Sequence, residues 1–145
     1  MNTENLSALF ENGAYTLVVQ KGGVTVHKDF GRGVGPALRV FDAQPERLKG
    51  ALGCDTIVGK AAAAIYLLGG ASCVYAETMS AAAAEFLTAN GVDCACETKT
   101  EKLLNRQGTG LCPFEQAVLE LERPEDCLPV VRATLARLMA GKNNK

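Results

Sequence analysis

The chain has 145 residues, of which 48% are apolar and 21% are charged. These values are ordinary for one globular domain and exclude a disordered or fibrous protein. The formal net charge of -1, from 15 basic and 16 acidic residues, gives no electrostatic basis for binding nucleic acid or an anionic membrane.

We expect one domain over residues 1–145, with a locally basic end from Arg137 to Lys145 and a disordered tail over about residues 141–145. Gly69, Gly70 and Ser72 interrupt the longest apolar run, and no basic segment precedes an apolar one at the N-terminus. The sequence therefore predicts neither a membrane-spanning helix nor a signal peptide, and a cytoplasmic location is the expectation.

The six cysteines are expected to be free thiols in a reducing compartment. Cys94 and Cys96 lie two residues apart on a predicted strand, too far apart for a disulfide. The chain has a single histidine, His27, and no Cys-x-x-Cys motif. We accordingly predict no metal site and no cofactor.

The N-terminal part predicts a helix followed by a hairpin. A helix is expected over Asn2–Glu11, where apolar residues recur at helical spacing. The segments Ala14–Gln20 and Val24–Phe30 are rich in β-branched and aromatic residues and flank Lys21-Gly22-Gly23, a typical hairpin turn. His27 is expected to point to solvent.

A short helix is expected over Gly35–Asp42, because Pro36 suits a helix start and Leu38, Val40 and Phe41 suit buried positions. Arg32 lies between two glycines just before it. An arginine in such a loop could bind an anion, although a charge solvated by water is the commoner case.

A third helix is predicted over Asp55–Leu68, with Asp55 as the N-cap and Gly69-Gly70 as the stop. Apart from Lys60 it is apolar on every side, which is typical of a helix buried against a sheet. The Lys60 ammonium must then either extend to the edge of the core or lie in a pocket.

The next segments predict a strand, a helix and a strand. Ser72–Glu77 is a continuous apolar run typical of a central strand. Ser80 suits the N-cap of a helix over Ala81–Asn90, and Val92–Glu97 alternates as a half-buried strand does. This order implies parallel strands joined by a right-handed crossover.

The C-terminal part predicts two helices. Pro113 suits the first position of one that runs to about Leu121. Cys112 would then be its N-cap, and Glu115 its third residue, whose carboxylate can reach back to the cap. Pro124 begins the last helix, whose first turn contains Pro129 unless that proline splits it. Its expected core stripe is Leu128, Val131, Leu135 and Leu138.

Together these elements predict an α/β sandwich, in which an antiparallel hairpin begins a mixed sheet and parallel strands continue it. Asn105–Glu115 is the stretch with the highest density of turn-forming, polar and reactive groups. Gly108 and Gly110 would turn backbone amides toward a ligand, Arg106 could bind a phosphate or carboxylate, and a thiol at a helix start is more readily ionised. The alternative is that Cys112 is a packed thiol and that the glycines merely turn the chain.

Two stretches carry a resemblance to a known family: Asp55–Ala62 followed by Val74–Glu77, and Asn105-Arg106-x-Gly108-x-Gly110-x-Cys112-Pro113-x-Glu115. They resemble the DUF1893 family, whose members look like the cytidine deaminase fold. The resemblance implies a three-layer α/β/α sandwich with a mixed five-stranded sheet.

Zinc deaminases carry His-x-Glu and Pro-Cys-x-x-Cys at two helix starts. The corresponding positions here look like Gly59-Lys60-Ala61 and Ser80-Ala81-Ala82-Ala83, which contain no zinc ligand. Hydrolytic deamination by the usual route is therefore not available. The resemblance implies a site where Lys60 and Ser80 would meet the Asn105–Glu115 stretch.

Three functions stay open. The first is a small-molecule enzyme, with Cys112, Lys60 and Glu115 as the catalytic candidates. The second is a non-catalytic sensor of an anionic or nucleotide-like ligand, and the third is an interaction protein, such as a homodimer formed through the N-terminal or C-terminal helices. The predicted ligand-binding residues are Asp55, Ser80, Asn105, Arg106, Gly108 and Gly110.

Overall fold

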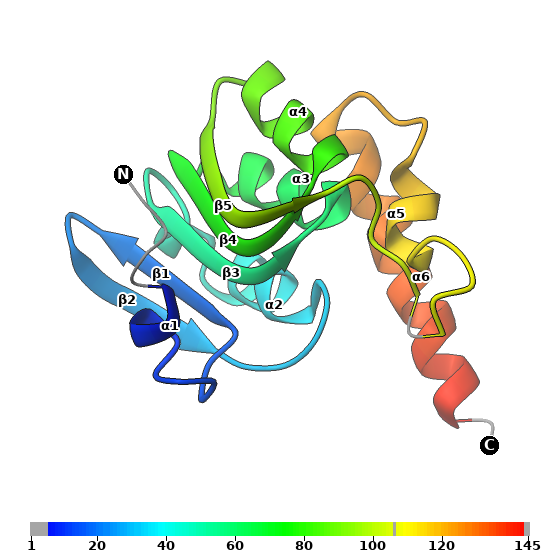
Figure 1. Ribbon diagram of the computed structural model, residues 1–145, viewed down its shortest axis with the longest axis horizontal. Helices are drawn as coiled ribbons and strands as arrows, with labels where there is room; N and C mark the ends of the chain where they lie inside the picture. Colours follow the sequence, from blue (N-terminus) through cyan, green and yellow to red (C-terminus); the bar gives the residue numbers. More distant parts are fainter. Residues whose placement is uncertain (1–5, 106, 144–145) are drawn as a thin grey trace.

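The computed structural model describes residues 6–105 and 107–143. Five strands form one sheet (Figure 1), namely β1 (Leu17–Lys21), β2 (Val24–Asp29), β3 (Leu52–Val58), β4 (Cys73–Ser80) and β5 (Asp93–Thr100). The helical elements are α1 (Leu6–Leu9), α2 (Gly35–Ala43), the 3-10 turn η1 (Pro45–Arg47), α3 (Lys60–Gly69), α4 (Ala81–Ala89), α5 (Pro113–Val118) and α6 (Pro124–Asn143).

The strand order in the sheet is β2-β1-β3-β4-β5. β1 pairs antiparallel with both β2 and β3, whereas β3, β4 and β5 are parallel. One register row crosses all five strands through Asp29, Leu17, Asp55, Ala76 and Cys96. The predicted mixed five-stranded sheet is thus confirmed.

The main core lies between the sheet and the helices on one of its faces. Four consecutive alanines of α3, Ala61–Ala64, are buried in this core. These small side chains allow the close packing that the alanine-rich sequence suggested. In Figure 1, α5 and α6 lie outside α3, and the C-terminal half of α6 projects away from the sheet.

The opposite face of the sheet carries a smaller apolar cluster. Leu6 and Phe10, in and just after α1, pack on Val18, Cys54 and Tyr75 from three neighbouring strands. Helices therefore cover both faces, in agreement with the predicted α/β/α layers. In the described part of the chain, the layer on this second face consists of one short helix.

The predicted helix over Asp55–Leu68 was wrong in its first part. Residues up to Val58 form β3, and the helix begins at Lys60. A short apolar segment fits a buried strand as well as a buried helix, and the β-branched residues Thr56, Ile57 and Val58 favour the strand. The stop was correct, because Gly70 adopts the left-handed conformation as the C-cap.

The expectation that His27 points to solvent was also wrong. Its side chain is 16% exposed, and its Nδ1 lies 3.0 Å from Arg47 Nη1. The cause is the register, since His27 pairs with Val19, a core residue of β1. Burial and the Arg47 guanidinium lower the pKa of His27.

Several other predictions are confirmed with small shifts of the boundaries. Gly22 and Gly23 both have positive φ and form the hairpin turn. The helix predicted at Gly35 is α2, and the Ser80 side chain caps α4 by accepting a hydrogen bond from the Ala83 N–H. Residues 2–5 of the first predicted helix lie outside the described part.

The last helix is continuous from Pro124, with Pro129 inside it. The side chains that it buries most completely are Cys127, Val131 and Thr134, while the other three predicted stripe residues are half-buried. Cys127 therefore takes the buried position predicted for Leu128, and Thr134 takes the one predicted for Leu135. None of the described helices is both long and apolar enough to cross a membrane.

Candidate functional site

The helices α3 and α4 begin side by side at the carboxyl edge of the parallel strands. Val58 and Met79 are partners in the β3–β4 register, and Gly59 and Ser80 follow them as the N-caps of the two helices. In open α/β sheets, this edge is where ligands commonly bind. It is the place at which the resemblance implied a site.

Glu115 of α5 connects that helix to the start of α3. Its Oε1 accepts a hydrogen bond of 2.7 Å from the Lys60 N–H, and its Oε2 accepts one of 3.1 Å from the Ala61 N–H. Gly59, the N-cap, has no side chain that could do this, and any Cβ on it would overlap the Glu115 carboxylate. The carboxylate therefore caps α3 from another helix.

This arrangement corrects the prediction that Glu115 reaches back to the cap of its own helix. Glu115 is 7% exposed, and burial raises the pKa of its carboxyl group, while the two backbone N–H groups and the Lys60 ammonium oppose that rise. A carboxylate at a helix N-terminus is favoured by the unpaired N–H groups and by the helix dipole. Glu115 thus has a structural role that the sequence did not reveal.

The place where Glu115 of α5 meets the start of α3 at Lys60 is called the Lys60 junction below. The Lys60 side chain extends along its surface. Its Nζ donates a hydrogen bond of 3.2 Å to the Leu119 carbonyl and lies 5.2 Å from the centroid of the Phe86 ring. Among the described residues, no carboxylate forms an ion pair with it. The nearby carboxylate, Glu115, is bound to backbone N–H groups instead.

Cys127 of α6 is the thiol whose pKa is affected by the charges of this junction. It is fully buried, and burial raises its pKa, whereas the Lys60 ammonium lowers it and Glu115 is among the groups that raise it. Sequence reasoning missed Cys127 and Phe86 as members of the junction. The spacing of Cys127, Val131 and Thr134 at i, i+4 and i+7 is the signal that could have placed Cys127 in the core.

The predicted loop after β5 closes on itself. Asn105 donates its N–H to the Gly110 carbonyl at 2.8 Å, and its Oδ1 accepts the Thr109 N–H at 3.0 Å. Gly108 has a φ of +71°, a conformation that glycine adopts readily. Asn105 and the two glycines thus form a compact turn, and Arg106 lies outside the described residues.

Cys112 is the N-cap of α5, as predicted, but its side chain makes no capping hydrogen bond. The thiol is half-buried, and its N–H donates to the Leu103 carbonyl at 2.9 Å. It lies on the same side of the sheet as Lys60, because α5, which it begins, supplies the cap of α3. Its role as a nucleophile stays a prediction.

Asp55 is separate from this junction. It is 4% exposed in the centre of β3, where its Oδ2 accepts a hydrogen bond of 2.8 Å from the Tyr66 hydroxyl and its Oδ1 accepts one of 2.9 Å from the Thr56 N–H. Burial raises the pKa of Asp55 to about 7. Its carboxyl group faces the core, not the start of a helix as predicted.

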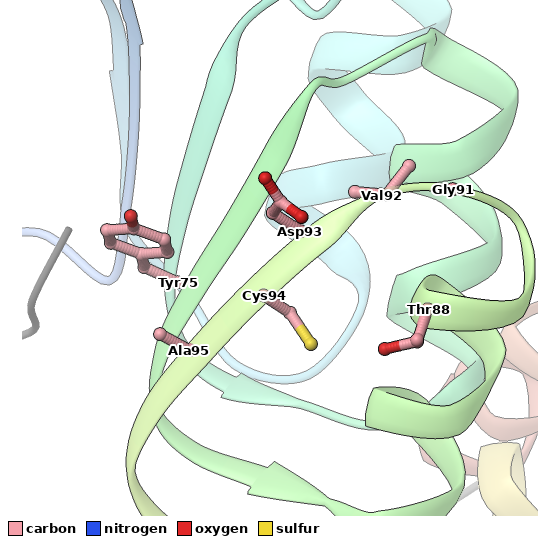
Figure 2. A pocket seen from close by; sticks show the side chains of 7 residues that line it. All are labelled: Tyr75, Thr88, Gly91, Val92, Asp93, Cys94 and Ala95. Atoms are coloured by element: carbon pink, nitrogen blue, oxygen red, sulfur yellow. The ribbon is translucent and has the colours of Figure 1, made fainter.

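A hollow of about 420 Å³ lies elsewhere, at the start of β5 (Figure 2). Its lining residues are Tyr75, Thr88, Gly91, Val92, Asp93, Cys94 and Ala95, none of which is a predicted site residue. Figure 2 shows the Cys94 thiol directed toward Thr88. No group of three or more His, Cys, Asp or Glu side chains within residues 6–105 and 107–143 is arranged to hold a metal ion.

Comparison with known proteins agrees with the fold. The crystal structure of a DUF1893 family protein (TM1506) from Thermotoga maritima has 29% sequence identity to this chain and a TM-score of 0.77. The match covers 94% of this chain and 92% of that one, whereas no curated protein matches. The family model TM1506, a domain of unknown function (DUF1893), matches residues 5–135. The chain therefore belongs to the DUF1893 family.

Proposed function

We propose that this protein binds a small anionic or nucleotide-like ligand at the carboxyl edge of β3 and β4. The observation that carries the proposal is the environment of Lys60. Its ammonium has one carbonyl acceptor and no carboxylate partner among the described residues. An ammonium has three donor hydrogens, so this group retains the capacity to bind an anion.

The surroundings of Lys60 suit a ligand with an anionic group and an apolar or planar part. The ammonium lies over the ring of Phe86, a residue that is 7% exposed, and Leu119, whose carbonyl accepts the Lys60 hydrogen bond, is 50% exposed. Ser80 begins the neighbouring helix, where it is 2% exposed and its Oγ accepts the Ala83 N–H. We propose it as a further ligand contact only through its hydroxyl hydrogen, which this cap does not use. The turn at Gly108 and Gly110 would border the ligand from the side of Cys112.

Binding without turnover is the form of the proposal that the hydrogen bonds favour. Both oxygens of Glu115 accept backbone N–H groups, and Lys60 Nζ donates to a carbonyl. Proton transfer by either group would first have to break these contacts, whereas binding an anion to Lys60 requires no such change. We therefore propose a ligand sensor and keep Cys112 as the candidate nucleophile of the alternative enzyme.

Thermal-shift measurements with nucleoside phosphates and sugar phosphates test the proposal. A ligand at 100 times its Kd adds about 2.7 kcal/mol of stability, which raises Tm by roughly 5 to 10 °C. Lys60→Gln should abolish the shift, while Lys49→Gln, at an exposed lysine, and Cys112→Ser should leave it unchanged. The proposal is wrong if no anionic metabolite raises Tm, or if the Lys60 variant responds as the wild type does.

A further inference from the structure

We propose that β5 is the surface through which two copies of this chain associate, as antiparallel strands that join two sheets into one. This interface is independent of the ligand site. β5 is the last strand of the sheet, and among the described residues it pairs only with β4. In a parallel pair, alternate residues of an edge strand direct their N–H and C=O groups outward, where another strand can bind them.

The two edges of the sheet differ in how well they suit this pairing. β2, at the other edge, has six residues, and its register with β1 shifts between Val19 and Gln20. β5 has eight residues, and its register with β4 is regular from Asp93 to Thr100. Because irregular strands resist pairing with another chain, the long and regular β5 is the better template.

The charges of β5 select a second copy of the same strand as the partner. With Cys96 on the two-fold axis, Asp93 lies opposite the partner's Lys99, and Lys99 lies opposite the partner's Asp93. All four side chains are exposed in the single chain and belong to the same face, since their positions differ by an even number. Opposite charges at directly opposed positions stabilise a strand pair.

The neighbouring registers are disfavoured by the same side chains. A shift of two residues in one direction places Asp93 opposite the partner's Glu97, and a shift in the other direction places Glu97 opposite itself. Both put like charges in direct opposition, which destabilises the pairing. The charge pattern thus specifies one register that uses the whole strand.

The hollow at the start of β5 lies beside this free edge. Thr88 of α4 and Asp93–Ala95 of β5 line it (Figure 2), so a partner strand on the edge would extend past its opening. The exposed end of α4 carries the small residues Thr88 and Ala89 there.

Light scattering and sedimentation velocity over a wide range of concentrations test the interface. We expect a reversible dimer, and Lys99→Asp should weaken its association at least about 30-fold, because it turns both opposed pairs into like charges. The double variant Asp93→Lys with Lys99→Asp restores opposite charges and should recover the dimer. Lys49→Asp, a charge reversal away from β5, is the matched control.

Hydrogen exchange supplies a second readout. In the wild type, the backbone amides of β5 should become more protected as concentration rises. Lys99→Asp should remove this gain, and its Tm should equal that of the wild type at concentrations at which the wild type is monomeric. A chain that is monomeric at every concentration would overturn the proposal. So would a dimer that Lys99→Asp leaves intact, since its interface would lie elsewhere.

Discussion

At the scale of the residue, the Glu115 side chain of α5 caps the start of α3. It satisfies two N–H groups at the start of α3 from a position far along the chain, and Gly59 leaves the space for it. Gly59 and Glu115 therefore form the cap of α3 together, because the carboxylate occupies the space that a side chain at Gly59 would fill. Sequence alone shows a glycine and a glutamate without the connection between them.

Substitutions at these two positions should not be additive. Glu115→Ala leaves two buried N–H groups unpaired and should lower the free energy of unfolding by about 2 to 4 kcal/mol. Gly59→Ala expels the carboxylate and should cost a similar amount, so the double variant should cost clearly less than the sum. Urea denaturation of the four proteins measures the cycle, and additive losses would mean that the two residues do not act together.

Asp55 makes stability depend on pH. Burial raises its pKa to about 7 in the folded state, against 3.8 without burial, so the folded state holds this proton where the unfolded state releases it. The free energy of unfolding therefore falls as pH rises from about 4 to about 7, by up to about 4 kcal/mol.

The Asp55→Asn variant isolates this contribution. Asparagine does not ionise, so the variant should lack this part of the pH dependence while other titrating groups, such as Glu115, act equally in both proteins. Urea denaturation at a series of pH values compares the two slopes. Equal slopes would mean that the fold does not raise the pKa of Asp55 and that its carboxyl group is ionised across this whole pH range.

At the scale of the element, β3 is the strand on which sequence reasoning failed most. The Tyr66 ring packs against Gly53, where a Cβ would come within 2.6 Å of Tyr66 Cε1, and the Tyr66 hydroxyl donates a hydrogen bond to Asp55. Gly53 and Asp55 are therefore strand residues whose side-chain size and polarity fit their contacts with Tyr66 of α3. From its immediate neighbours alone, an aspartate before an apolar run indicates a helix N-cap. The residue that shows otherwise is Tyr66, whose hydroxyl binds Asp55 from eleven residues further along the chain.

Gly53→Ala tests that packing. The added methyl group must displace the Tyr66 ring, and overpacking of this kind should cost about 1 to 3 kcal/mol of stability. Gly141→Ala, at a helical glycine with no neighbour near a Cβ, is the control and should be neutral or slightly stabilising. A fully stable Gly53→Ala protein would show that the ring moves without loss.

At the scale of the whole molecule, periodicity and caps predicted most of the fold. They identified the hairpin, α2, α4 and the parallel pairing of β4 and β5. What they could not identify were contacts between distant segments, such as Glu115 with α3 and Cys127 with the Lys60 junction. These depend on which faces meet after folding, and a single sequence does not record that.

The two apolar clusters on opposite faces of the sheet should open separately. Cys54 is buried by Leu6 and Phe10 beside the short α1, whereas Cys127 lies in the main core. Phe10→Ala should therefore accelerate alkylation of Cys54 about tenfold and leave Cys127 unchanged. Mass spectrometry of the labelled peptides measures both rates, and equal acceleration would indicate that the clusters open together.

The link between Glu115 and α3 also bears on how the chain matures during synthesis. The sheet and the first four helices are complete by residue 100, yet the start of α3 has no cap until residue 115 has left the ribosome. A nascent chain arrested before that point would carry a loosened α3 and an uncovered main core. The last third of the polypeptide is thus needed to cap α3 and to cover the core that the first two thirds form.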